Sequence, residues 1–356
     1  MAVKASIIWL NYNSMRFKDV VLQSLDSFLN LDYDGYELVV VDNASSDGSF
    51  EIVKRHVEER KPGGLRVKVV RNEVNLGYAG GMNRGWSARD PDSKYVAFVN
   101  NDFIAEPDSL SRIIDFLEGE ERAVAASGLV AYPDGRIYSA GWAIDELLTA
   151  LNICNGVEAT DCPTASRAQP VTYADGSYYV AKAKYIHKYG FDGRPFIDET
   201  FLYSDDSLLS LRLWNYGLRS YYVPVRAGVH FISQTTKGLG MINYYVIRAK
   251  FIAYRLVETK YSIRLPLYYF RIREMSRVLC KLRLKNYCTM YKAVVDGNRI
   301  GKKIRSLYGP LQLKKAPYVP MPSYLILLHT FLPVRSMFMR SRFITHDMLK
   351  ADGVRF

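Results

Sequence analysis

The sequence predicts an α/β protein built on a parallel sheet, followed by a basic and mainly helical region. Two observations predict this organisation. Short apolar strands alternate with helical segments over residues 6–102, which is typical of right-handed βαβ units whose sheet is covered on both faces. Beyond residue 235 this alternation stops, and long basic and aromatic stretches with few acidic residues replace it.

The first third of the chain contains the expected parallel strands. They are the apolar runs Ser6–Leu10, Glu37–Val41, Val67–Arg71 and Tyr95–Val99. Apolar residues at helical spacing predict the intervening helices Phe17–Leu29, Phe50–Glu59 and Gly80–Ala88. In such sheets ligands bind at the carboxyl ends of the strands. The polar residues that follow the strands, Asn11, Asp42, Asn75 and Asp102, are therefore expected to line a ligand site.

The segment from residue 122 to residue 222 has a mixed pattern. Strands are expected at Val124–Tyr132, Val171–Ala181 and Arg219–Val223, the last ending before Pro224. Helices are expected at Lys182–Tyr189 and Ser207–Tyr216, with Gly217 as the residue that ends the second one.

Charge divides the 356-residue chain into two expected domains. Residues 1–235 hold 24 Lys and Arg against 31 Asp and Glu, a net charge of −7, whereas residues 236–356 hold 24 against 5, a net charge of +19. This step predicts a boundary between an acidic domain 1–235 and a basic region 236–356. It also predicts an anionic partner for the basic region, and nucleic acid, anionic lipid and a phosphorylated acceptor all remain compatible with charge alone.

The cysteines and the N-terminus favour a reducing, cytoplasmic setting. Cys154, Cys162, Cys280 and Cys288 lack C-x-x-C spacing, so the pattern indicates neither a zinc ribbon nor a disulfide framework. The opening residues lack the long apolar run and small-residue cleavage site of a signal peptide. Residues 316–334 carry no charged side chain, but four prolines make a segment lying in a membrane interface a better expectation than a spanning helix.

Four segments carry residues suited to chemistry, and each also has a purely structural explanation. Asn100–Asp102 could hold Mg²⁺ or Mn²⁺ through its carboxylate, or could cap a helix. The glycine-containing stretch Asn75–Asn83 could approach a phosphate closely or form a plain turn. Asp205 and Asp206 could supply a general base or stabilise a helix N-terminus. His230 could ligate a metal or serve the structure.

The order and spacing of these segments resemble family 2 glycosyltransferases. The resemblance covers about residues 4–235. The matching segments are Ser6–Ser14 (SIIWLNYNS), Glu37–Gly48 (ELVVVDNASSDG), Asn75–Gly85 (NLGYAGGMNRG), Val96–Asp102 (VAFVNND), Phe201–Arg212 (FLYSDDSLLSLR) and Tyr222–His230 (YVPVRAGVH). Arg136–Gly141 (RIYSAG) adds a resemblance to the rhamnosyl- and galactofuranosyl-transferase-like members.

The resemblance implies a GT-A fold and inverting transfer of a sugar from a nucleotide-diphosphate donor. The acceptor would be a hydroxyl of a saccharide or a polyprenyl-phosphate-linked saccharide. Carried over residue by residue, the donor-binding residues would be Asn11, Tyr12, Asn13, Asp42, Asn75, Gly77, Asn83 and Asn101. Asp102 and His230 would ligate Mn²⁺ or Mg²⁺. Asp206 would be the catalytic base, with Asp205 in place of the Glu beside it.

Two departures from the family pattern bear on activity. Leu208 stands where members often carry another acid, two residues after the base. Asn100 and Asn101 stand where many members have acids, so metal binding should be weaker here. An alternative is therefore a catalytically degenerate protein that only binds nucleotide-sugar.

Two further classes of function fit the sequence less well. A nucleotidyltransferase would have a glycine-rich, lysine-containing loop after the first strand, where this chain has residues 11–16, NYNSMR. A nucleic-acid-binding protein could use the basic tail, but no RNP-like, zinc-finger or helix-turn-helix signature supports it, and domain 1–235 is acidic. We expect no nucleic-acid partner. Instead, we expect the basic region to bind the acceptor and an anionic membrane surface, making the protein peripheral on the inner face of the cell membrane; a solvated basic bundle is the alternative.

Overall fold

The computed structural model describes residues 4–232, 242–262, 265–322 and 324. The chain divides into two compact units. Unit 1 comprises Met1–Gly141 and Asn152–Leu239, and unit 2 comprises Trp142–Leu151 and Gly240–Phe356.

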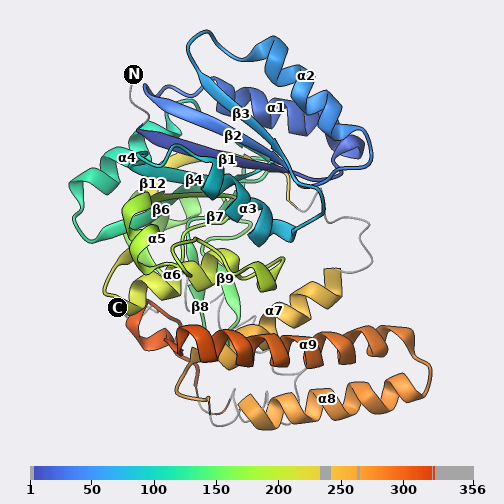
Figure 1. Cartoon of the computed structure of the whole chain (residues 1–356). Coiled ribbons are helices and arrows are strands. Elements are labelled where there is room, and N and C mark those ends of the chain that lie inside the picture. Colours follow the sequence, from blue (N-terminus) through green and yellow to red (C-terminus); the bar gives the residue numbers. More distant parts are fainter. Residues whose placement is uncertain (1–3, 233–241, 263–264, 323, 325–356) are drawn as a thin grey trace. The chain divides into compact units, whose positions relative to one another are not determined.

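Unit 1 is an α/β sheet domain (Figure 1). Its strands are β1 (Ala5–Asn11), β2 (Tyr36–Asp42), β3 (Arg66–Arg71), β4 (Tyr95–Asn100), β5 (Phe103–Ala105), β6 (Ala123–Ala131), β7 (Ile137–Ser139), β10 (Gln169–Val171), β11 (Tyr178–Lys182) and β12 (Arg219–His230). Its helices are α1 (Lys18–Leu29), α2 (Ser49–Arg60), α3 (Gly77–Ala88), α4 (Ser109–Gly119), α5 (Ala183–Tyr189) and α6 (Asp205–Asn215). The elements predicted up to residue 102 all form, with ends shifted by at most three residues.

The sheet runs in the order β10-β12-β6-β11-β4-β1-β2-β3. Strands β4, β1, β2 and β3 are mutually parallel, which confirms the parallel sheet predicted for the first third of the chain. Strand β11 is antiparallel to both β4 and β6, so the complete sheet is mixed. In the register of β1 and β2, Asn11 lies beside Asp42, which brings the polar ends of these strands together.

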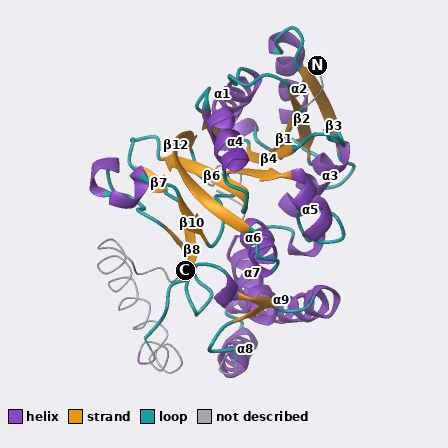
Figure 2. Cartoon of the chain, turned by 90° about the vertical axis from the view of Figure 1, so that its left-hand side faces the viewer, coloured by secondary structure: helices purple, strands orange, loops and turns teal. Residues whose placement is uncertain are grey.

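Helices cover both faces of this sheet (Figures 1 and 2). Successive side chains of a strand point to opposite faces, so Ile7 and Trp9 pack in one core and Ile8 in the other. The first core also receives side chains of α1, α2 and α4, and the second those of α3, α5 and α6. Because both faces of the sheet are buried, its strands are continuous apolar runs in the sequence.

Two predicted strands differ from the structure. The single strand expected at Val171–Ala181 is broken into β10 and β11. The break is a turn at Asp175, whose carboxylate accepts hydrogen bonds from the backbone and hydroxyl of Ser177 at 2.9 and 2.6 Å. The strand expected to stop before Pro224 continues to His230, because register shifts between Tyr222 and Arg226 accommodate the proline.

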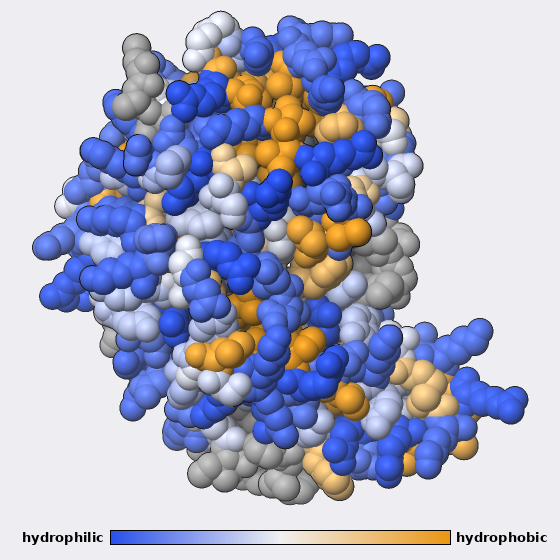
Figure 3. Space-filling view, in the orientation of Figure 1, coloured by the Kyte–Doolittle hydropathy of each residue, from blue (hydrophilic) through white to orange (hydrophobic). Residues whose placement is uncertain are grey.

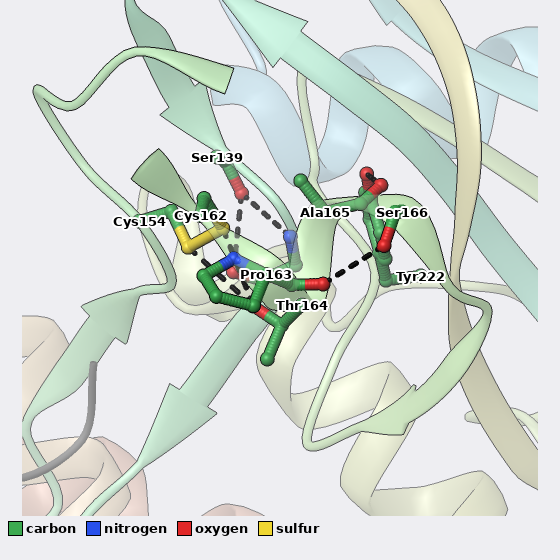
Figure 4. The surroundings of a disulfide bond; sticks show 9 residues. Ser139, Cys154, Cys162, Pro163, Thr164, Ala165, Ser166 and Tyr222 are labelled. Carbon is green, nitrogen blue, oxygen red and sulfur yellow. Dashed lines mark hydrogen bonds between the residues drawn. A yellow bond between two sulfur atoms is a disulfide. The ribbon is translucent and has the colours of Figure 1, made fainter. Parts of the chain in front are cut away.

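The cysteines correct a second expectation. The spacing indicated no disulfide framework, but Cys154 pairs with Cys162, and Cys280 with Cys288. Figure 4 shows the first bond, which closes a short loop beside Thr164. The segment just after Cys162 is attached to β12, because the Tyr222 hydroxyl donates to the carbonyl of Ala165 at 2.8 Å. The structure thus fastens two loops covalently that the sequence left unconnected.

Unit 2 is mainly helical, as predicted for the basic region. It contains α7 (Ile242–Leu256), α8 (Leu265–Lys281), α9 (Lys285–Tyr308) and the short parallel pair β13 (Val257–Glu258) and β14 (Leu311–Gln312); β8 (Trp142–Ile144) and β9 (Ala150–Asn152) form a separate hairpin. Helices α7 and α9 approach so closely at Gly297 that a Cβ there would lie 2.5 Å from the Arg248 carbonyl oxygen. Among the described residues no helix is long and apolar enough to cross a membrane. Most of the interfacial segment expected at 316–334 lies outside the described residues.

Candidate active site

The carboxyl ends of β1 and β2 form a buried polar cluster. Asn11 and Asp42 are both fully buried, and the Asn11 amide donates to an Asp42 carboxylate oxygen at 3.0 Å. The same amide lies 3.3 Å from the hydroxyls of Ser45 and Ser49. The second Asp42 oxygen accepts the Ser45 N–H at 3.0 Å and lies 3.6 Å from Arg71 Nε. A buried carboxylate held this way presents a fixed acceptor at the sheet edge.

The loop after β1 continues this cluster. The Asn13 backbone N–H donates to Ser45 Oγ at 3.0 Å, and its side-chain oxygen accepts the Ser46 N–H at 2.8 Å. Asn13 has a φ of 43°, in the left-handed region that Asn tolerates better than most residues. Tyr12, between Asn11 and Asn13, is half-buried. These bonds fasten the loop after β1 to the loop after β2.

The turn that leads into α3 is fixed by side-chain bonds. Asn75 accepts the N–H of Gly77 and the amide of Asn43, both at 2.8 Å. Gly77 has a φ of +72°, and a Cβ there would lie 2.3 Å from the Phe201 carbonyl oxygen. The N–H of Tyr78 donates to that same oxygen at 2.6 Å. The start of α3 is therefore bound to the segment that precedes α6.

Asn83 has structural partners on the far side of α3. Its amide donates to the Phe196 carbonyl at 2.8 Å and to Asp198 at 2.7 Å, and its oxygen accepts the Phe196 N–H at 3.2 Å. These bonds use the amide within the protein. The structure therefore does not join Asn83 to the cluster around Asn11 and Asp42.

The turn after β4 connects the strand-end cluster to a buried acid–imidazole pair. The Asn101 amide donates to the Asn11 side-chain oxygen at 3.2 Å. Asp102 and His230 are 4% and 6% exposed, and Asp102 Oδ1 lies 3.1 Å from His230 Nε2. They meet because β5 pairs with the end of β12, which places Phe103 opposite His230. Two residues that are distant in the sequence thus form one pair.

Asp102 and His230 fit a divalent metal by the chemistry of their donor atoms. A carboxylate oxygen and an imidazole nitrogen are both ligands that Mn²⁺ accepts. His230 Nδ1 is buried with no hydrogen-bond partner among the described residues. Burial by itself would lower the pKa of His230, but the adjacent Asp102 carboxylate outweighs it and the pKa is raised. In the described part of the chain no three His, Cys, Asp or Glu residues gather as a metal site, so a bound ion would need oxygens from a ligand.

The two acidic residues at the start of α6 differ in their surroundings. Asp205 is buried and accepts a hydrogen bond from the Thr200 hydroxyl. Asp206 is half-buried and accepts the Ser207 N–H at 2.7 Å. Tyr203 and Ser204, just before the helix, have φ angles of 73° and 66°, a strained backbone for residues other than glycine.

Asp206 lies against the turn that breaks β10 from β11. A Cβ at Gly176 would be 2.5 Å from Asp206 Oδ2, so a larger residue there would displace the Asp206 carboxylate. Burial raises the pKa of Asp206 to about 7; the Ser207 N–H opposes this shift and Asp175 adds to it. The Tyr78 hydroxyl donates to the Gly176 carbonyl at 3.1 Å, which joins this turn to α3. Asp206 therefore has a carboxyl group that can both hold and release a proton near neutral pH.

Tyr138 packs against His230 and lies within electrostatic range of Asp206. Its ring centroid lies 5.3 Å from that of His230. Its pKa is raised by burial first, and then by the nearby charges of Asp175, Asp206 and Asp102, among others. Neither Tyr138 nor Asp175 was predicted from the sequence as a site residue. The polar D-G-S turn of Asp175 inside an apolar run was the signal that could have identified it.

The comparisons with known proteins agree with this fold. Residues 6–157 match the family model described as "Glycosyl transferase family 2", so the chain contains a domain of this family. A glycosyltransferase of Haemophilus influenzae, whose activity is uncharacterised, is 30% identical over 120 residues. That match covers 34% of this chain and 34% of the relative, so the activity of the whole relative does not transfer.

Solved structures extend the similarity beyond the matched segment. The mannosyltransferase PcManGT from Pyrobaculum calidifontis, solved with GDP-Man and Mn²⁺, has a TM-score of 0.51 at 17% identity and covers 86% of this chain and 88% of that one. GalNAc-T7, solved with UDP, GalNAc and Mn²⁺, has a TM-score of 0.56 at 13% identity and covers 86% and 59%. At these identities the likeness shows the fold, which confirms the predicted GT-A-like architecture. It does not select the rhamnosyl- or galactofuranosyl-like subgroup.

Proposed function

We propose that this protein is an inverting glycosyltransferase that moves a sugar from a nucleotide-diphosphate donor to a hydroxyl of a saccharide or polyprenyl-phosphate-linked acceptor. One observation carries the proposal. Side-chain hydrogen bonds join Asn11 to Asp42 and to Asn101, and the neighbouring Asp102 pairs with His230. Tyr138 packs on His230, and the charge of Asp206 is near enough to raise the pKa of Tyr138. The glycosyl transferase family 2 match and the GT-A-like neighbours that bind nucleotides and Mn²⁺ support it.

In this proposal the strand-end cluster binds the nucleoside. Asp42 would accept a hydrogen bond from the base or ribose, and the loop at Tyr12 and Asn13 would close over it. Asn75 and Gly77 would line the diphosphate side, since the backbone at Gly77 can approach a ligand closely. Asp102 and His230 would hold Mn²⁺ or Mg²⁺ beside the diphosphate. When bound, that ion neutralises the charge of the departing diphosphate.

Asp206 would act as the base. Its carboxylate accepts the proton of the acceptor hydroxyl while that oxygen forms a bond to the anomeric carbon. The bond from the anomeric carbon to the diphosphate oxygen breaks at the same time, and the nucleoside diphosphate leaves with the electron pair. A single displacement inverts the anomeric configuration. Asp205, buried with its Thr200 bond, would fix the start of α6 and thereby the position of Asp206.

Residues 236–356 would serve the acceptor. We assign residues 1–235 as the catalytic domain and residues 236–356 as an acceptor- and membrane-facing region of a cytoplasmic protein. A role in polysaccharide biosynthesis at the inner face of the membrane would follow, because lipid-linked acceptors carry phosphates that match a +19 region.

The test is a thermal-shift screen of UDP-, GDP-, dTDP- and CDP-sugars, each with and without Mn²⁺. A ligand that binds only the folded state raises its melting temperature by mass action. We expect a Mn²⁺-dependent shift with one nucleotide, followed by release of that nucleoside diphosphate when acceptor is supplied. No shift with any donor in a folded sample would overturn the proposal.

A nucleotide-sugar-binding protein without turnover is the second candidate, because Leu208 is buried in α6 where family members often carry an acid. It predicts a donor-dependent shift without release of nucleoside diphosphate under any acceptor or hydrolysis condition.

A further inference from the structure

Helix α8 of unit 2 and the turn that follows it carry an exposed face that combines apolar and basic side chains. Five large apolar side chains are exposed between residues 270 and 284: Phe270 (55%), Met275 (45%), Val278 (53%), Leu282 (66%) and Leu284 (47%). Exposed basic residues stand among them at Arg271, Arg277, Lys281, Arg283 and Lys285. Figure 3 shows blue and orange side chains interspersed over the part of unit 2 that holds α8, at the lower right.

Helical spacing explains why these side chains share one face. Arg271, Met275, Val278 and Leu282 follow one another at steps of four, three and four residues, which aligns them along a helix. Phe270, Glu274, Arg277 and Lys281 form the adjacent row at the same steps. Ile272 and Ser276, on the opposite side, are buried. We call the first two rows the outer face of α8.

The outer face has a large positive charge. Glu274 is the one acidic residue of α8, and it lies 2.7 and 2.6 Å from Arg273 and Arg277. Its charge is therefore neutralised within the helix. The Cys280–Cys288 bond joins the end of α8 to the start of α9 across the turn that carries Leu282 and Leu284. The turn is held in place while its apolar side chains face outward.

We propose that the outer face of α8 docks on an anionic lipid bilayer. Its apolar side chains would enter the boundary between headgroups and acyl chains, and its basic side chains would lie among the acidic headgroups. A second copy of this chain fits poorly, because two such faces would repel each other. The proposal deepens the membrane-facing role given to residues 236–356 above and rests on it, but it requires no catalytic activity.

The test is co-sedimentation of the full chain with vesicles. One set is phosphatidylcholine alone and the other contains about a third phosphatidylglycerol. We expect binding to the acidic vesicles only, weakened by salt because the basic contribution is screened. Each Lys or Arg near such a surface contributes about fivefold in affinity, so Arg271→Gln with Lys281→Gln should weaken binding by about tenfold or more.

The apolar side chains need their own variant. Val278→Ser with Leu282→Ser removes apolar area from the same face and should also weaken binding by about tenfold or more. Matched controls lie elsewhere: Arg55→Gln with Arg60→Gln removes the same charge from α2, and Leu307→Ser removes an exposed leucine (61%) from α9. The controls should bind like the wild type. Equal thermal unfolding of all variants would show that each remains folded.

Several outcomes would overturn the proposal. These are no binding to acidic vesicles, equal binding to neutral ones, or variants of α8 that bind as tightly as the controls. Dimerisation lost in Val278→Ser with Leu282→Ser would assign the face to a second copy, and retention of a nucleic-acid probe lost in Arg271→Gln with Lys281→Gln would assign it to nucleic acid. Binding to vesicles by a protein that shows no donor-induced shift would leave this proposal standing and reject the proposed function alone.

Discussion

Asp205 and Asp206 are neighbours in the sequence, but their burial and their contacts in the fold differ. Asp205 is buried against the Thr200 hydroxyl, whereas Asp206 is half-buried against Gly176. We expect Asp206→Asn to lower kcat by at least about 100-fold, since a positioned base contributes about that much or more. The Kd for donor should stay nearly unchanged, because the amide keeps the shape of the carboxylate.

The matched variants for this prediction are Asp92→Asn on an exposed turn and Asp205→Asn. Asp92→Asn should change neither kcat nor stability. Asp205→Asn should lower the melting temperature, because it weakens a buried hydrogen bond worth about 1–3 kcal/mol. Donor binding lost together with kcat in Asp206→Asn would contradict the base assignment.

The raised pKa of Asp206 also predicts a dependence of stability on pH. Its pKa is about 7 in the folded protein against an ordinary value of 3.8, so the folded state holds this proton more tightly than the unfolded chain. Stability from this group is present below about pH 4 and is lost as the pH rises to about 7. Without donor or metal, Asp206→Asn should therefore be more stable than wild type at pH 8, by up to about 4 kcal/mol. Calorimetry at pH 4 and pH 8 checks this, and a variant less stable at pH 8 would be the contrary result.

At the scale of elements, the contact of α3 with the segment before α6 positions the site. Gly77 touches the Phe201 carbonyl, and no larger residue fits its φ of +72°. Gly77→Ala should destabilise the protein by about 2 kcal/mol or more and should reduce kcat, because the turn before Asp206 must move. Gly135→Ala is the control, since Gly135 has a φ of +91° with open space around it. Both variants carry backbone strain, so an equal loss of kcat in the two would reject the contact as the cause.

The disulfide between α8 and α9 is a second element-scale feature. Replacing Cys280 and Cys288 by Ser should destabilise unit 2 by about 2–3 kcal/mol, the typical effect of closing a short loop. Thermal unfolding with and without reductant measures it, and mass spectrometry of the alkylated protein checks that the bond forms. Such bonds are rare in reducing compartments except in hyperthermophiles, so a fully reduced protein from its native cell would contradict this expectation.

At the scale of the whole molecule, the division into two compact units predicts how the chain unfolds. Separate cores need not unfold together, so calorimetry should show two transitions. The proposed donor site lies in unit 1, so donor with Mn²⁺ should raise only one of them. The Cys280→Ser/Cys288→Ser variant should lower the other. A donor that raises both transitions equally would indicate that the units unfold as one.

Much of the α/β domain was predictable because its information is local. Apolar runs, helical spacing and the polar residues after each strand identified β1 to β4, α1 to α3 and the positions of Asn11 and Asp42. The position of the D-G-S turn was less predictable, because residues 171–181 have the composition of one strand and the break depends on bonds made by Asp175. From the sequence, His230 was expected to lie beyond the end of its strand. The strand in fact continues past Pro224, and this could not be predicted locally because it depends on pairing with β6.

By itself, the sequence determined the alternation of strands and helices, the acidic and basic halves of the chain, and the residues suited to binding and proton transfer, because these follow from composition and spacing. Only the tertiary structure decided which of them meet. Asp102 reaches His230 through the pairing of β5 with β12, and Asp206 is distinguished from Asp205 by a glycine thirty residues earlier in the chain. The physical reason is that contact and burial depend on the packing of elements distant in sequence, and these contacts set the pKa values and partners that give each acid its role.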